Sequence, residues 1–112
     1  MSSFIQIEMD FLKDLNELKS VLLQADKTTH IVLYVTAGWC KVCTKMSPII
    51  QQYVNSKSNM VFVMADYDVA KTIVHKYKIR VVPCFIRFLN NEIESICMSG
   101  AEKDISDFFS EF

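Results

Sequence analysis

Glycine and proline are scarce in this chain of 112 residues, which contains only two of each. That scarcity excludes collagen-like sequence and Pro/Gly-rich low-complexity sequence. An excess of charge of one sign is also lacking, because 13 acidic and 12 basic residues leave a formal net charge of -1. Without a basic field to hold a phosphate backbone, we expect no nucleic-acid partner.

Long hydrophobic runs are absent as well. The longest apolar stretches, residues 31–35 and 81–86, have the length of strands and fall far short of the roughly 20 residues of a membrane-spanning helix. The first residues, Met-Ser-Ser-Phe, lack the basic region and apolar core of a secretory signal. Four irregularly spaced cysteines are too few for a disulfide scaffold. We therefore expect a cytoplasmic protein without a membrane segment.

Apolar residues make up 51% of the chain and include eight Phe and four Tyr, which excludes intrinsic disorder. The length supports one domain, residues 1–112, and we expect it to be a monomer. A domain of this size buries roughly 60–70% of the surface of its extended chain, so it can fold without a disulfide or a metal.

Strand and helix patterns alternate along the chain. Strands are expected at residues 4–7, 30–36, 60–65, 84–89 and 93–98. The last two read as a hairpin, because Asn90 and Asn91 tolerate the left-handed conformation of a tight turn. The stretch 30–36 is apolar without alternation, which is typical of a strand buried on both faces.

Four helices are expected between and after these strands. The first is capped by Asp10, and the second starts near Cys40 and contains Pro48. Their expected apolar faces are Phe11, Leu15, Leu18, Leu22 and Ala25 in the first; Cys43, Met46, Ile50 and Tyr53 or Val54 in the second; Val69, Ile73 and Tyr77 in a short third; and Ile105, Phe108, Phe109 and Phe112 in the last. The order βαβαβαββα predicts an α/β fold, with helices on both faces of a mixed central sheet.

The segment Gly38-Trp39-Cys40-Lys41-Val42-Cys43 lies between a buried strand and a helix. Three helical residues bring the two cysteines onto one face with backbones about 5–6 Å apart, which suits a disulfide. Cys40 would lie at the helix N-terminus, where free N–H groups and the helix dipole stabilise a thiolate, and Lys41 and Lys45 add positive charge. The thiolate is the species that attacks disulfides.

A structural metal site is the alternative interpretation of these cysteines. Zinc requires four ligands, and the remaining candidates, Cys84, Cys97, His30 and His75, supply no second C-x-x-C and no H-x-x-x-H. One C-x-x-C pair does not argue for an iron–sulfur cluster either. We expect no metal, and we place Cys84 and Cys97 in the core.

Four features in order give the chain a resemblance to the thioredoxin family over residues 4–109. They are Trp39-Cys40-x-x-Cys43, Pro48 in the following helix, Val82-Pro83 before the hairpin, and Gly100 before the last helix. The resemblance implies the thioredoxin fold and a cis Val82-Pro83 bond facing the two cysteines, and chemistry permits a cis bond before proline. It also implies that protein substrates contact Trp39, Val82 and Pro83.

The activity implied is thiol–disulfide exchange on protein disulfides. Cys40, expected to be the exposed cysteine, attacks the substrate, and the more covered Cys43 resolves the mixed disulfide. No cofactor would be bound. A flavin-containing thioredoxin reductase drawing on NADPH would restore the dithiol, as the resemblance implies, with roles in electron transport and cell redox homeostasis.

The sequence departs from the family pattern at several positions. Lys41 and Val42 stand where thioredoxins usually have Gly-Pro, and Cys84 follows the proline where threonine is common. Tyr34 aligns with the family's buried aspartate, and Met64 aligns with the lysine that partners it. These four departures are expected to alter rate, redox poise and choice of partner rather than the fold. The resemblance also implies that Cys84 lies near the active pair, so a redox role for it stays open.

Two other functions remain open. The fold could serve as a catalytically weakened binding or assembly module, or it could carry glutathione-linked, glutaredoxin-like chemistry, since Val82-Pro83 and Ser99-Gly100-Ala101 loosely resemble glutaredoxin elements. The full strand and helix expected before the motif favour the thioredoxin type. The basic run Lys76, Lys78 and Arg80 reads as a solvated face, with a partner-binding patch as its second interpretation.

Overall fold

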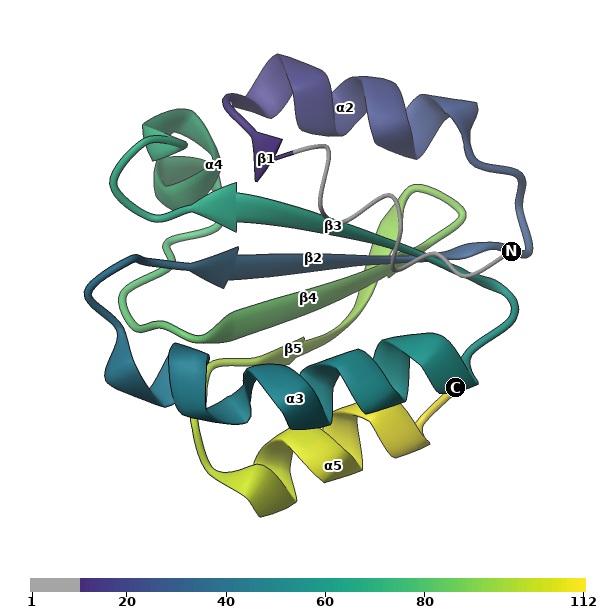
Figure 1. The fold of residues 1–112 in the computed structure, drawn as a ribbon. Helices are drawn as coiled ribbons and strands as arrows, with labels where there is room; N and C mark the ends of the chain where they lie inside the picture. Colours follow the sequence, from purple (N-terminus) through teal and green to yellow (C-terminus); the bar gives the residue numbers. More distant parts are fainter. Residues whose placement is uncertain (1–10) are drawn as a thin grey trace.

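The computed structural model describes residues 11–112, which form a five-stranded sheet flanked by four helices (Figure 1). In chain order the elements are β1 (Phe11–Leu12), α2 (Leu15–Gln24), β2 (His30–Thr36), α3 (Lys41–Ser56), β3 (Met60–Asp66), α4 (Lys71–Lys76), β4 (Cys84–Leu89), β5 (Glu92–Cys97) and α5 (Glu102–Ser110). The strand order is β1-β3-β2-β4-β5. Strands β1 and β2 run parallel to β3, β4 runs antiparallel to β2, and β5 antiparallel to β4. The expected mixed sheet is confirmed.

Strand β2 lies at the centre of the sheet, with β3 on one side and β4 on the other. Successive side chains of a strand point to opposite faces, so Leu33 and Val35 pack into one apolar cluster and Val32 and Tyr34 into the other. This two-sided burial is why the segment shows no polar alternation.

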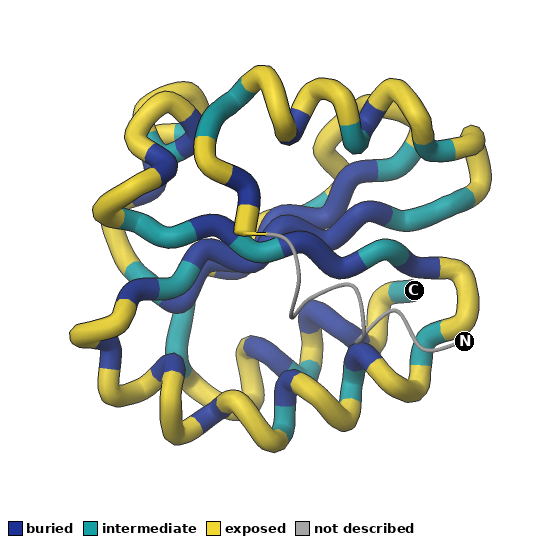
Figure 2. The backbone as a smooth tube through the Cα atoms, turned by 45° about the horizontal axis from the view of Figure 1, so that its top comes forward, coloured by how far each residue is buried: buried dark blue, intermediate teal, exposed yellow. Residues whose placement is uncertain are grey.

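The two faces of the sheet are covered by different helices. Helices α2 and α4 supply Leu18, Leu22 and Ile73 to one cluster. Helices α3 and α5 supply the other with apolar residues that include Ile50, Val54, Ile105, Phe108 and Phe109. Figures 1 and 2 show this arrangement, with buried residues concentrated in the sheet and on the inner sides of the helices. The apolar faces expected for the second and last helices are therefore confirmed, apart from Phe112.

The N-terminal part of the fold differs from the prediction. Helix α2 is capped by Asp14, whose carboxylate accepts a 2.9 Å hydrogen bond from the Glu17 backbone N–H, and it does not start after Asp10. Phe11 belongs instead to β1, opposite Met64 of β3, and its side chain is half exposed. The prediction that Phe11 belongs to the apolar face of the first helix is therefore wrong, because Phe11 pairs in the sheet. The strand expected at residues 4–7 and the cap at Asp10 lie outside the described residues.

Smaller differences occur at the ends of other elements. Val69 is exposed before α4 rather than part of its apolar face, and β5 ends at Cys97, one residue earlier than expected. Phe112 follows α5 instead of belonging to it. The hairpin turn is as predicted, because Asn90 and Asn91 have φ values of 52° and 66°.

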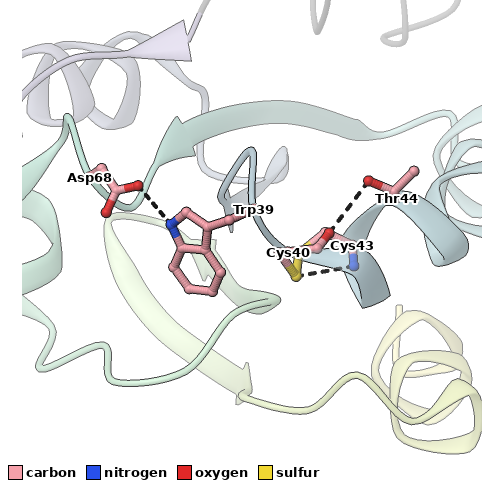
Figure 3. Close-up of a disulfide and its surroundings, with 5 residues drawn as sticks. All are labelled: Trp39, Cys40, Cys43, Thr44 and Asp68. Atoms are coloured by element: carbon pink, nitrogen blue, oxygen red, sulfur yellow. Dashed lines mark hydrogen bonds between the residues drawn. A yellow bond between two sulfur atoms is a disulfide. The ribbon is translucent and has the colours of Figure 1, made fainter.

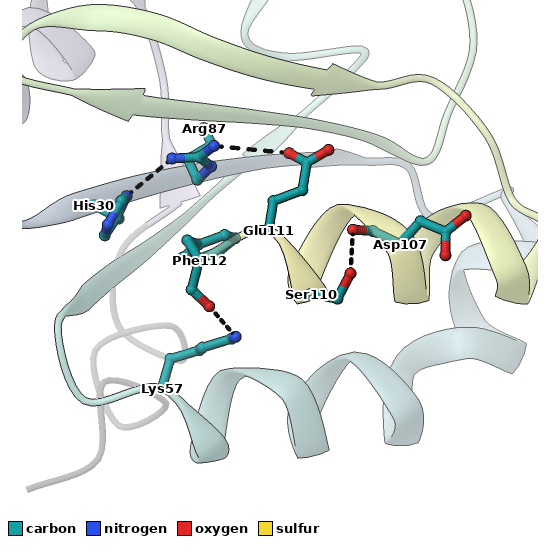
Figure 4. Close-up of polar contacts among 7 residues, drawn as sticks. All are labelled: His30, Lys57, Arg87, Asp107, Ser110, Glu111 and Phe112. Carbon is teal, nitrogen blue, oxygen red and sulfur yellow. Dashed lines mark hydrogen bonds and ion pairs between the residues drawn. The ribbon is translucent and has the colours of Figure 1, made fainter.

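A charged cluster lies near the N-terminal end of β2 (Figure 4). Arg87 is only 8% exposed. Its guanidinium lies 3.1 Å from Nδ1 of His30 and 3.7 Å from a carboxylate oxygen of Glu111, and it stacks 4.8 Å from the ring centre of Phe112. Burial, followed by the nearby charge of Arg87, lowers the pKa of His30. These contacts attach the end of α5 to the sheet, and they give His30 a role in packing.

Candidate redox site

The two cysteines of the C-x-x-C motif lie where β2 passes into α3, at the opposite end of β2 from the charged cluster. Cys40 is the N-cap residue of α3, and Cys43 lies in the first turn of that helix. Their side chains form a disulfide, with Cα atoms 5.3 Å apart (Figure 3). The expected spacing and the expected position at a helix N-terminus are both confirmed.

The sulfur of Cys40 is held by the start of the helix. Its Sγ accepts a 3.1 Å hydrogen bond from the backbone N–H of Cys43, and its carbonyl oxygen accepts bonds from the backbone and hydroxyl of Thr44. After reduction, the N–H of Cys43 and the positive end of the helix dipole favour the thiolate at this sulfur. Lys41 and Lys45 are exposed on the same helix and add positive charge.

Solvent exposure does not separate the two cysteines as we expected. Cys40 is 6% exposed and Cys43 is 4% exposed, and both pack with Ala37, Tyr67 and Val82. Cys40 is covered by the sulfur of Cys43, to which it is bonded, and by the apolar residues of this cluster. The distinction between them is instead positional, because the Cys40 sulfur caps the helix and receives the N–H of Cys43.

Trp39 projects from the loop before the disulfide and is 62% exposed. Its indole Nε1 donates a 2.8 Å hydrogen bond to the Asp68 carboxylate, and its ring meets Tyr67 edge-on at 6.3 Å between ring centres (Figure 3). Asp68 and Tyr67 are site residues that sequence reasoning missed. Their only signal was their place directly after β3, whose end lies beside the end of the parallel strand β2.

The peptide bond between Val82 and Pro83 is cis, as the resemblance implied. Val82 packs against the cysteine cluster, and Pro83 is buried. Gly100 lies against the same loop, because a Cβ atom added to it would stand 2.5 Å from Cγ1 of Val42 and 3.4 Å from Cδ of Pro83. The structure therefore brings together the motif, the proline loop and the glycine before α5, three segments far apart in the sequence.

Tyr34 does not lie in the cluster around the cysteines. Its ring is buried on the face of the sheet covered by α3 and α5, where it stacks on Phe85 at 4.7 Å between ring centres. Burial raises the pKa of Tyr34, although a hydrogen bond with the Thr36 side chain acts in the opposite direction. Met64 is paired with Tyr34 across β2 and β3 and belongs to the same apolar cluster.

Cys84 and Cys97 are free and buried, as expected for core residues. The pKa of Cys84 is raised to about 12, mainly by burial, so its thiol is protonated at neutral pH. Burial also raises the pKa of Cys97. Within residues 11–112, no three His, Cys, Asp or Glu side chains gather in a group that could hold a metal ion.

Comparison with known proteins decides the family. The family model named thioredoxin matches residues 11–111. The chain belongs to the thioredoxin family. The thioredoxin of Mycoplasmoides gallisepticum is 32% identical over 72 residues, which are 64% of this chain and 70% of that protein. The structure of reduced Schistosoma mansoni thioredoxin pre-protein shows 27% identity, covers 90% of this chain and 94% of its own, and superposes with a TM-score of 0.79.

A second kind of relative is a much longer protein. A Caenorhabditis elegans peptide-N(4)-(N-acetyl-beta-glucosaminyl)asparagine amidase is 35% identical over 89 residues, which are 80% of this chain but only 14% of that protein. A segment similar to this chain therefore forms a small part of a much longer protein. At family level, the domain and its adjacent cysteine pair support thiol–disulfide oxidoreductase chemistry. No helix among residues 11–112 is both long and apolar enough to cross a membrane.

Proposed function

We propose that the chain reduces protein disulfides through the dithiol form of Cys40 and Cys43. The observation that supports this most is the disulfide at the start of α3, bordered by the cis Val82-Pro83 bond and the exposed Trp39. The Cys40 thiolate attacks one substrate sulfur, the substrate disulfide breaks, and the departing sulfur takes up a proton. Cys43 then loses its proton and attacks Cys40, which releases the second substrate thiol and leaves the Cys40–Cys43 disulfide.

The assignment of Cys40 as nucleophile rests on its position. Its sulfur caps α3 and receives the N–H of Cys43, an arrangement that lowers the free energy of a thiolate there. In this proposal Cys43→Ser accumulates mixed disulfides with target proteins, and Cys40→Ser does not. Equal trapping by the two variants, measured on non-reducing gels, would contradict the assignment.

The surface around the disulfide suits an extended polypeptide with apolar side chains. Trp39, Val42 and Val81 are exposed at 62%, 43% and 47%, and Val82 packs against the cysteine cluster. Removing such side chains from water contributes roughly 25 cal/mol per Å² of apolar area, and this contribution offsets part of the entropy that association costs. We propose Trp39, Val82 and Pro83 as the substrate-binding residues, with Lys41, Val42, Tyr34, Met64 and Cys84 modulating the chemistry.

The reducing equivalents are proposed to come from NADPH through a thioredoxin reductase. This follows the family, whose members act on protein disulfides and are reduced by that enzyme. The same proposal places the chain in the cytoplasm as a single monomeric domain that takes part in electron transport and redox homeostasis. The chain spans only 14% of the length of one relative and 28% of another.

A reduction assay separates this proposal from its two rivals. Insulin disulfides are offered to the chain with NADPH and thioredoxin reductase, with NADPH, glutathione and glutathione reductase, or with neither system. Turnover with thioredoxin reductase supports the proposal, and turnover only with glutathione supports glutaredoxin-like chemistry. No turnover in any arm indicates a binding module. The variant Cys40→Ser/Cys43→Ser is the control and should be inactive throughout.

A further inference from the structure

A surface pocket of about 530 Å³ opens between the end of β3, α4 and the loop that follows α4. Three cationic side chains line it: Lys71 from α4, and Lys78 and Arg80 from the loop. The basic residues of the pocket therefore differ from the basic run in the sequence, because Lys71 lines the pocket and Lys76 does not.

The positive charge of this pocket exceeds the negative charge of the residues that line it. Lys71, Lys78 and Arg80 are exposed, and none of them forms an ion pair with a carboxylate of residues 11–112. Asp68 is the one acidic residue that lines the pocket; its carboxylate accepts the indole N–H of Trp39 and keeps its negative charge, so the three cations still leave the lining with a formal excess of two positive charges. The three cations therefore have no ion-pair partner among the described residues, and the pocket can bind an anionic ligand.

The pocket adjoins the redox site through two shared residues. Tyr67 lines the pocket and also packs against the cluster of Ala37, Cys40 and Cys43. Asp68 lines it and holds the indole of Trp39 beside the disulfide. A polypeptide whose disulfide contacts Cys40 and Trp39 would therefore carry its neighbouring residues toward Lys71, Lys78 and Arg80.

We propose that this pocket, defined by Lys71, Lys78 and Arg80, binds acidic side chains that flank the disulfide of the substrate protein. The inference rests on the proposed function, since it names the class of disulfide that the chain selects. Carboxylates fit because the guanidinium of Arg80 can pair with them through two parallel hydrogen bonds, and the two lysines add positive charge to the same pocket. The pocket thereby ranks substrates without touching the reacting sulfur atoms.

The test uses two disulfide peptides that differ only in having Glu or Gln beside the cysteines. We expect the reduced protein to react ~3- to 10-fold faster with the Glu peptide at low salt, and the preference to fade as salt screens these exposed charges. In Lys71→Gln/Lys78→Gln/Arg80→Gln the Glu/Gln rate ratio should fall to about one. The control Lys19→Gln/Lys27→Gln/Lys103→Gln changes the net charge equally, away from the pocket, and should keep the preference.

A second measurement tests whether the pocket binds acidic peptides, independently of turnover. An NMR titration with a cysteine-free Glu peptide should shift amide signals between residues 67 and 80, and the triple variant should lose these shifts. An unchanged rate ratio in the triple variant, shifts elsewhere, or equal binding of inorganic phosphate would overturn the assignment to acidic polypeptide. If even the Gln peptide is not reduced, the proposed function fails, and the titration still decides whether acidic peptides bind here.

Discussion

The indole of Trp39 and the carboxylate of Asp68 are joined by a 2.8 Å hydrogen bond between a loop before α3 and the loop after β3. Since Trp39 is 62% exposed and touches Tyr67 only edge-on, this bond is the main polar restraint on the ring. It holds an apolar surface in place beside the disulfide without burying it.

Loss of the Asp68 carboxylate should therefore loosen Trp39 more than it destabilises the fold. We expect Asp68→Ala to cost about 0.5–1 kcal/mol of unfolding free energy, because the bond is solvent-exposed. The rate of disulfide reduction should fall a few-fold. Trp39 is the only tryptophan, so its fluorescence anisotropy reports the change directly. Asp68→Asn keeps an acceptor oxygen and should retain the anisotropy; an equal loss in both variants would contradict this role.

Lys41 should make the cysteine pair more oxidising, because a cation beside Cys40 favours the thiolate and thus the reduced form. We expect Lys41→Glu to lower the reduction potential by on the order of 10 mV, which corresponds to a few tenths of a pKa unit for a screened surface charge. Equilibration with dithiol buffers measures it. Lys45→Glu, four residues further along α3, should shift the potential less; a potential that is unchanged or higher in Lys41→Glu contradicts the account.

Resolution of the mixed disulfide should be slow near neutral pH, because Tyr34 replaces the family's aspartate. A buried phenol with a raised pKa stays protonated at neutral pH and cannot take the Cys43 proton. Stopped-flow release should rise about tenfold per pH unit below an ordinary thiol pKa of about 8.5.

Two variants test this proton route. Tyr34→Asp with Met64→Lys places an acid and its partner on paired positions of β2 and β3, and it should speed release near neutral pH. Tyr34→Phe preserves the stack on Phe85 without adding a base and should leave the pH profile unchanged. A fast release independent of pH in the natural chain would show that another group accepts the proton.

Close packing of Gly100 against Val42 predicts a specific pair of effects. Gly100→Ala should lower the unfolding free energy by about 1–3 kcal/mol, because its Cβ meets Cγ1 of Val42 at 2.5 Å. Gly38→Ala is the matched control, since nothing lies within 4 Å of its added Cβ, and it should change stability by less than about 0.5 kcal/mol.

The same clash should be relieved by shortening its partner. In a double-mutant cycle measured by urea unfolding, Val42→Ala should restore most of the stability lost in Gly100→Ala. Purely additive effects would mean that the two side chains do not meet in solution.

The thiol of Cys84 should not react with alkylating reagents in the folded protein. Its pKa is raised from 9.0 to about 12, so alkylation of the reduced protein near neutral pH should modify Cys40 and Cys43 but reach Cys84 only after unfolding. The folded state then holds the Cys84 proton more tightly than the unfolded state, and stability contributed below pH 9 is lost as pH rises toward 12. The fall should be shallower in Cys84→Ala. Rapid alkylation of Cys84 in the native protein would overturn this prediction.

Much of the fold was predictable where local pattern and tertiary structure agree. Local sequence pattern is enough to predict three features: the buried strand His30–Thr36, the hairpin turn at Asn90 and Asn91, and the inner face of α3. The start of α2 was mispredicted because Phe11 has helical spacing to Leu15 yet pairs in the sheet with Met64. The pair Asp14 and Glu17, three residues apart, was the available signal for the true cap.

The candidate site was predictable only in its local part. Cys40, Cys43 and the proline loop follow from a short motif and a family resemblance. Asp68 and Tyr67 reach Trp39 only because parallel strands β2 and β3 end side by side, a contact that no local pattern encodes. Exposure of Cys40 was mispredicted for a similar reason, since Ala37, Tyr67 and Val82 come together around it from three segments.

The central claim is best tested by a single-turnover electron balance. Reduced protein is mixed without oxygen with an excess of a protein disulfide, and the substrate thiols and the protein's own disulfides are counted by alkylation and mass spectrometry. The account predicts two substrate thiols for each Cys40–Cys43 disulfide formed, with Cys84 and Cys97 still reduced. Substrate left fully oxidised, or thiols released while Cys40 and Cys43 stay reduced, would contradict it.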